Sequence, residues 1–211
     1  MLYPRTEGKQ RDGHLAMDLL RRYLEQEAKT IRSNTTLTYF DLVESARLSL
    51  LDAGQIHPLT KVRAPRWKVW PDAGTALKKL QTKGYRIVAL PNVDRSTFTA
   101  IRPLLEDGFQ FDAIVDTPSV RGIFTQDEDP YKDTIRLCGD KFHATPKQIL
   151  MVSTGGYRCI EPSTLLGTPT AWVRRDGSLE GSEQLAEILV TKPTFTVGSL
   201  EELSEVLVGN I

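Results

Sequence analysis

The stretch KGYRIVALPNVDRSTF, residues 83–98, decides the fold that we expect for this chain of 211 residues. Residues 86–90 form a short apolar run, which is typical of a buried strand. Residues 94–106 follow with apolar side chains at helical spacing, and Asp94 is a suitable N-cap for that helix. A strand that leads directly into a helix favours a parallel sheet with helices packed against it.

The same alternation continues through the last two thirds of the chain. It predicts strands at residues 86–90, 112–115, 148–152, 170–173 and 195–197. It predicts helices at residues 72–82, 94–106, 130–139, 161–166, 182–189 and 199–208. Because parallel strands need crossover connections, this spacing indicates an α/β fold with helices on both faces of the sheet.

The N-terminal third has a different pattern. Residues 14–30 and 39–53 show helical apolar spacing, and we find no strand before them. Residues 57–71 hold three prolines and two tryptophans, which suits a linker. We therefore expect a small helical cap at residues 10–65 and an α/β core at residues 66–211.

Composition narrows the class of partner. Lys plus Arg and Asp plus Glu number 27 each, and no basic stripe indicates a nucleic-acid surface. The apolar runs are too short to span a bilayer, and residues 1–13 lack the apolar part of a secretory signal. With only two cysteines, a reduced cytoplasmic protein is the simplest interpretation. We expect a small-molecule substrate, with no nucleic acid and no membrane as partner.

Three core stretches and the helical region resemble the haloacid dehalogenase superfamily, within it the type II, 2-haloacid dehalogenase-like branch. Residues 67–98 resemble the return from the cap and the second motif, and residues 111–138 the third motif. Residues 148–175 resemble the fourth motif and its next strand, and the helices at residues 14–53 resemble the cap. The resemblance implies a Rossmann-like parallel sheet with a small helical cap.

The chain departs from this family at its catalytic positions. Residues 1–9 resemble a remnant of the first motif, with Met1 where the family has its nucleophilic Asp. Pro91 replaces the small hydroxyl residue before Asn92, and Asp127 replaces the lysine of the third motif. Ser153 and its neighbours replace the carboxylates of the fourth motif. Since Mg²⁺ requires carboxylate oxygens, we expect no metal, no cofactor and no Mg²⁺-dependent phosphoryl transfer.

The resemblance also places the first strand between the second-motif and fourth-motif strands. Without it, strand edges inside the protein lose their partners, which is costly. We expect direct pairing of residues 86–90 with residues 148–152, or partial filling by residues 1–8, or cover from a second chain, in that order. A homodimer is therefore one expected arrangement.

Candidate site residues follow from the rule that ligands bind outside the carboxyl ends of parallel strands. As an acid–base group we select Asp94, Asp129, Glu161 and Arg158. As substrate-binding residues we select Asn92, Thr154, Tyr157, Trp67, Trp70 and His14. Each has a structural alternative: a helix cap for Asp94, the first turn of a helix for Glu161, and core packing for the tryptophans.

Three functions remain open. The resemblance and the lost nucleophile favour a non-hydrolytic enzyme of secondary metabolism that catalyses an acid–base rearrangement or cyclisation, such as epoxide opening. The same losses fit a catalytically inactive binding protein. A residual, dehalogenase-like hydrolase would need a substitute carboxylate such as Asp12 or Asp94.

Overall fold

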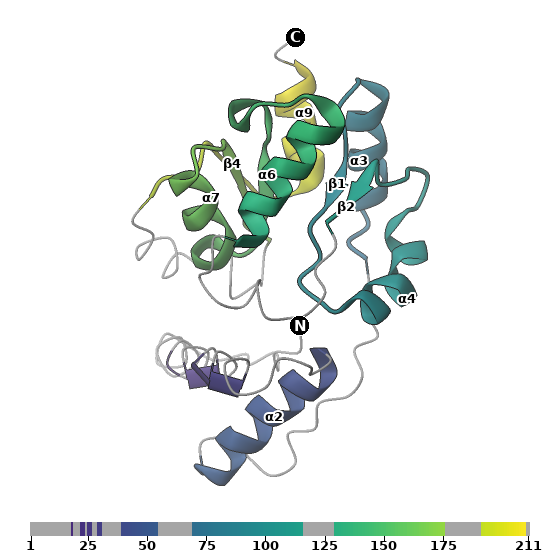
Figure 1. The fold of residues 1–211 in the computed structure, drawn as a ribbon. Coiled ribbons are helices and arrows are strands. Elements are labelled where there is room, and N and C mark those ends of the chain that lie inside the picture. The colour runs from purple at the N-terminus through teal and green to yellow at the C-terminus, as the bar shows by residue number, and fades with distance from the viewer. Residues whose placement is uncertain are drawn as a thin grey trace.

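The computed structural model describes residues 39–54, 69–115, 129–175 and 191–209, with scattered helical residues between 18 and 30. Helix α2 (Tyr39–Asp52) lies apart from the strands, beside those first helical residues (Figure 1). It buries one face through Leu42, Ala46 and Leu50. The predicted helix at residues 39–53 is thus confirmed, whereas the division into cap and core stays a prediction.

The core alternates strands and helices as expected. Its strands are β1 (Val88–Ala89), β2 (Ala113–Ile114), β3 (Met151–Ser153), β4 (Thr170–Val173) and β5 (Phe195–Val197). Its helices are α3 (Ala73–Thr82), α4 (Arg95–Leu105), α6 (Asp129–Phe142), the π-helix η2 (Gly156–Ile160), α7 (Glu161–Leu165) and α9 (Leu200–Gly209). Strands β4 and β5 match their predicted bounds. Strand β3 begins later than predicted, and the first residue of the predicted strand belongs to the 3₁₀ helix η1 (Pro146–Gln148). The predicted helix at residues 182–189 lies outside the described residues.

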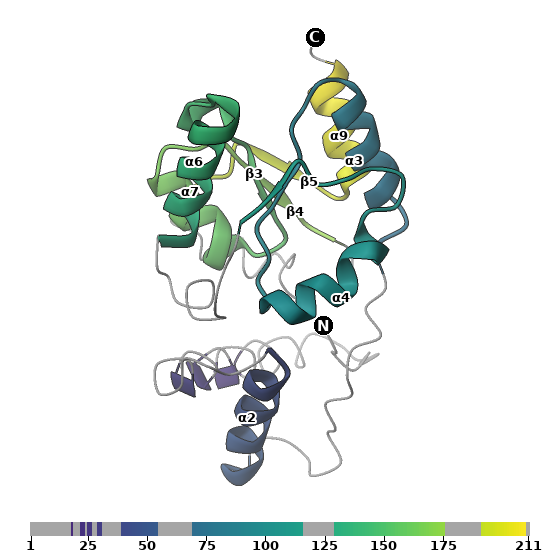
Figure 2. The same cartoon turned by 45° about the vertical axis from the view of Figure 1, so that its right-hand side comes forward.

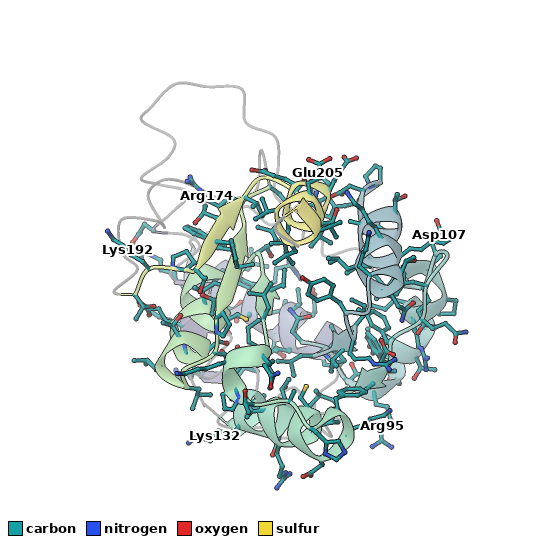
Figure 3. All side chains as sticks on the ribbon, turned by 90° about the horizontal axis from the view of Figure 1, so that it is seen from above. Arg95, Asp107, Lys132, Arg174, Lys192 and Glu205 are labelled. Atoms are coloured by element: carbon teal, nitrogen blue, oxygen red, sulfur yellow. The ribbon has the colours of Figure 1, made fainter. Side chains whose placement is uncertain are left out.

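Helices cover both faces of the strands. Tyr131 and Cys138 of α6 pack with Met151 of β3, while Leu203 of α9 packs with Ala171 and Val173 of β4. Figure 2 shows α6 and α9 on opposite sides of β3, β4 and β5. Seen from above, Lys132 on α6 and Glu205 on α9 lie at opposite margins of the molecule (Figure 3). The α/β class with a Rossmann-like layering is therefore confirmed.

The described strands form two separate parallel sheets, β1–β2 and β3–β4–β5. The expected direct pairing of the β1 and β3 segments is wrong. Among the described residues, apolar side chains connect the two sheets, because Val88 of β1 and Leu90 after it pack into the same apolar cluster of α6 as Met151. On the other face α3 lies along α9 (Figure 2). Packing against α6 thus contributes to the positions of both β1 and β3.

Asp72, at the start of α3, holds three distant segments together. Its two carboxylate oxygens both accept from Nη1 of Arg175, at 2.8 Å. One oxygen also accepts from the amides of Leu200 and Glu201 at the start of α9. The ring of Trp70 covers the guanidinium of Arg175 at 4.8 Å. Since the side chains of Arg175 and Asp72 are only 8% and 14% exposed, this is a largely buried ion pair.

No described helix has the combination of length and apolar character that a membrane crossing requires.

We predict that Asp72→Asn destabilises the fold in a pH-dependent way. Burial alone would raise the pKa of Asp72, but Arg175 and the two amides outweigh it and hold the pKa below its usual range. Because the folded pKa is depressed, this stabilisation is present above the unfolded pKa and is lost as pH falls through the folded value. At pH 7 we expect a loss of roughly 3 kcal/mol, the lower end for a broken buried pair.

The measurement is urea unfolding of the wild type and the variant between pH 7 and pH 3. Asp107→Asn is the matched control, since Asp107 is exposed and lies at the margin of the molecule (Figure 3). The difference between wild type and Asp72→Asn should shrink towards acid pH. A difference that stays constant over this range would contradict the assignment.

Candidate active site

The candidate site lies at the carboxyl ends of β1 and β3. After β1 the chain passes through Pro91, which is buried, and Asn92, which is exposed, into α4. After β3 it passes through Ser153, Thr154 and Gly155 into η2. Helix α4 lies on the side of the core nearest to α2 (Figure 1). A ligand at these strand ends would thus lie between the core and the helical region.

Asp94 is the N-cap of α4. Its carboxylate accepts from the amide of Thr97 at 3.0 Å and from the Thr97 hydroxyl at 2.7 Å. The hydroxyl of Ser96 donates to the same carboxylate. Both carboxylate oxygens thus have partners on α4 itself. The structure thus shows the structural alternative for Asp94, which is a helix cap.

The start of η2 has no corresponding side-chain cap. Its N-cap is Gly155, whose own amide donates to Oγ of Ser153 at 3.0 Å. The first helical bonds run from the amides of Cys159 and Ile160 to the carbonyl of Gly155. The amides of residues 156–158 therefore have no hydrogen-bond acceptor within the helix. They lie where the chain leaves the carboxyl end of β3.

Neutral hydroxyls and a thiol line the base of this turn. The Cys159 thiol contacts the side chains of Ser153, Ser163 and Tyr131. Burial raises the pKa of the Cys159 thiol, and the three hydroxyls lower it only in part. The thiol is therefore protonated at neutral pH and is a poor nucleophile. Sequence reasoning did not select Tyr131 or Ser163, because each resembled an ordinary buried helix residue.

The remaining predicted residues have varied positions. The carbonyl of Thr154 accepts from Nε1 of Trp172 at 2.9 Å, which fixes the turn after β3. Glu161 is partly buried in the first turn of α7. Trp70 is 51% exposed and stacks on Arg175, so it belongs to the Asp72 ion pair.

Several of the predicted site residues, or their side chains, lie outside the part of the chain that the structure describes. His14 and Trp67 are not among the described residues, and Asp127 of the third motif is not either. The backbones of Asp129, Tyr157 and Arg158 lie in α6 and η2, but their side chains are outside the described part. Their roles stay predictions. Among the described residues, no three His, Cys, Asp or Glu side chains are grouped to hold a metal ion.

We predict that Asp94→Ala lowers the free energy of unfolding by about 1 kcal/mol, because α4 loses its N-cap. Asp94→Ser should retain most of the stability, since a serine hydroxyl also caps. Chemical denaturation of both variants measures the effect, with Asp107→Ala as the exposed control. Equal stability of Asp94→Ala and wild type would show that the cap contributes nothing.

Comparison with known proteins gives the fold a family context. No protein-family model matches the chain, and no curated protein matches it. Solved structures do match, with low sequence identity. The L-2-haloacid dehalogenase from Xanthobacter autotrophicus has a TM-score of 0.63 at 17% identity, covering 94% of this chain and 87% of that one.

Two further solved structures also match this chain. The same enzyme with chloropropionic acid covalently bound has a TM-score of 0.64 at 19% identity, covering 99% of this chain and 89% of that one. A haloacid dehalogenase-like (HAD) phosphatase from Thermococcus onnurineus has a TM-score of 0.53 at 15% identity, covering 92% and 90%. The chain therefore has the fold of the haloacid dehalogenase superfamily, with L-2-haloacid dehalogenases among its structural neighbours.

Proposed function

We propose that this chain is a small-molecule enzyme of the dehalogenase-like type, which binds a small organic acid at the turn between β3 and η2. The observation that carries the proposal is the start of η2 at Gly155, which has no side-chain cap. Backbone amides at a helix start, directed at the carboxyl end of a parallel strand, favour an anionic group. A substrate carboxylate supplies that group.

The contrast with α4 supports this assignment. Both helices begin at the carboxyl end of a strand, and α4 begins with a carboxylate from its own chain, Asp94. At η2 the equivalent place is occupied by Gly155. A bound carboxylate at η2 would accept from the amides there, as Asp94 accepts from the amide of Thr97 in α4.

The substrate class also agrees with a structural neighbour. The dehalogenase from Xanthobacter autotrophicus has been observed with chloropropionic acid covalently bound. A short carboxylic acid with a reactive carbon next to the carboxylate is therefore the first class to test here. Ser153 and Thr154, both partly buried beside the turn, supply neutral donors and acceptors for such a molecule.

Two candidates remain for what the protein does with the bound acid. An acid–base rearrangement or cyclisation, such as epoxide opening in a secondary-metabolite pathway, needs a carboxylic acid that can release a proton. Asp94 caps α4, so Glu161 is the remaining acid–base candidate whose side chain the structure describes. Asp129 and Arg158 stay predictions. The engagement of Asp94 and the neutral Cys159 site favour, as a second candidate, a protein that binds without catalysis.

Binding is tested by titrating the protein with propionate, 2-chloropropionate and propionamide and following its melting temperature. We expect both acids to stabilise the fold and the uncharged amide to leave it unchanged. Gly155→Asp should abolish the effect, because the new carboxylate caps η2 itself, whereas Gly155→Ala should retain it. Stabilisation by the amide, or persistence in Gly155→Asp, would argue against the site.

The fate of the bound acid separates the candidates. Chloride release from 2-chloropropionate indicates a dehalogenase-like reaction. A product of unchanged mass from an epoxy acid indicates rearrangement. Binding of these acids without a product indicates a binding protein, and the absence of binding rejects the proposal.

A further inference from the structure

A cavity of about 310 Å³ lies between α3 and α9. Figure 2 shows these two helices side by side, on the face of β3, β4 and β5 opposite to α6. Its volume is at the lower end of the range for ligand pockets, so it suits a small molecule and not a dinucleotide. The cavity is lined by the turn before α3, by α3 and by the first turn of α9, through Pro71, Asp72, Thr75, Ala76, Lys79, Glu201 and Ser204.

The base of the cavity is small and uncharged. Ala76 on α3 is 2% exposed and Ser204 on α9 is fully buried. The hydroxyl of Ser204 donates to the carbonyl of Glu201 at 2.7 Å, so it already has a partner within its own helix. Any polar recognition of a ligand in this cavity therefore has to come from the side chains around the base.

Two opposite charges flank this base. Lys79 on α3 and Glu201 on α9 are both exposed, and both line the cavity. Asp72 lines it too, but its carboxylate is already bound to Arg175 and to amides of α9. Among the described residues, neither Lys79 nor Glu201 has an ion-pair partner, and the two do not pair with each other. The cavity thus presents one ammonium group and one carboxylate that the described residues leave unpaired.

The neighbours of these two residues have other contacts. Glu202, which follows Glu201 in the first turn of α9, accepts from the amide of Gly198 at 2.7 Å. The side chain of Lys78, which precedes Lys79 on α3, lies close to Gly108. In each pair of neighbours, the residue that lines the cavity is the one without such a contact.

We propose that this cavity binds a small zwitterion of the amino-acid class, with its carboxylate at Lys79 and its ammonium group at Glu201. A ligand with a single charge would pair with one of these side chains and be repelled by the other, whereas a zwitterion pairs with both. The small base beside Ala76 leaves room for a short aliphatic side chain. This inference does not depend on the acid site proposed at η2.

The test is an NMR titration of the whole protein with L-valine, followed through the backbone amides. We expect saturable shifts at the amides of Ala76, Lys79 and Ser204. N-acetyl-L-valine and L-valinamide, which each keep one of the two charges, should bind about tenfold more weakly or less, because a charge-assisted hydrogen bond is lost. The amides of Gly155 and Gly156 report the η2 site separately, so either site can fail without affecting the result for the other.

Variants at the two charged positions complete the test. Lys79→Met and Glu201→Gln should each weaken L-valine binding about tenfold or more. Lys78→Met and Glu205→Gln are the matched controls, since they make the same changes at exposed positions of α3 and α9 outside the cavity lining. Both controls should bind as the wild type does.

Three results would overturn the proposal. The first is the absence of saturable shifts at the cavity in the wild type. The second is equal binding of L-valine and either single-charge analogue at the cavity amides. The third is unchanged binding in Lys79→Met or Glu201→Gln, with the amide spectrum showing that the variant is folded.

Discussion

The arrangement of the core depends on the ion pair between Asp72 and Arg175. Asp72 stands at the start of α3, Arg175 follows β4, and the amides that Asp72 also binds belong to α9. Although Asp72 is placed as the N-cap of α3, its side chain makes no bond to that helix and instead stabilises the start of α9. Because α3 lies along α9 and α9 packs on β4, this interaction joins the start of α3 to the half of the core that contains β3, β4 and β5.

Among the described residues, helix packing and not a backbone ladder connects β1 with β3. A buried peptide group without a hydrogen-bond partner costs about 1–3 kcal/mol, and this cost applies to any strand edge that has no neighbouring strand. The apolar cluster shared by α6, β1 and β3 offsets part of it by burying Met151 and Tyr131.

Much of the fold could be predicted from local sequence, and the reasons are specific. Strand β4 is buried at all four positions, and its run TAWV is visible without knowledge of its neighbours. The cap of α4 was equally visible, because Asp94 and Thr97 are three residues apart. Asp72 was not recognised, because its partners lie 103 and 128 residues along the chain. The separation of β1 from β3 is a feature of the tertiary structure, which no local pattern encodes, and direct pairing was therefore expected wrongly.

The same distinction explains the candidate site. The residue types that sequence reasoning preferred were charged, and Asp94 was selected because a carboxylate near a strand end is conspicuous. In the structure its charge is used within α4, and the open position is a glycine, Gly155, which sequence reasoning did not select for the site. A helix start without a cap is recognised because no neighbouring side chain accepts from its amides. Only the three-dimensional structure shows this. A carboxylate from a ligand and a carboxylate from the chain are alternatives for such a position, so the absence of a capping side chain at Gly155 makes a ligand carboxylate chemically reasonable there.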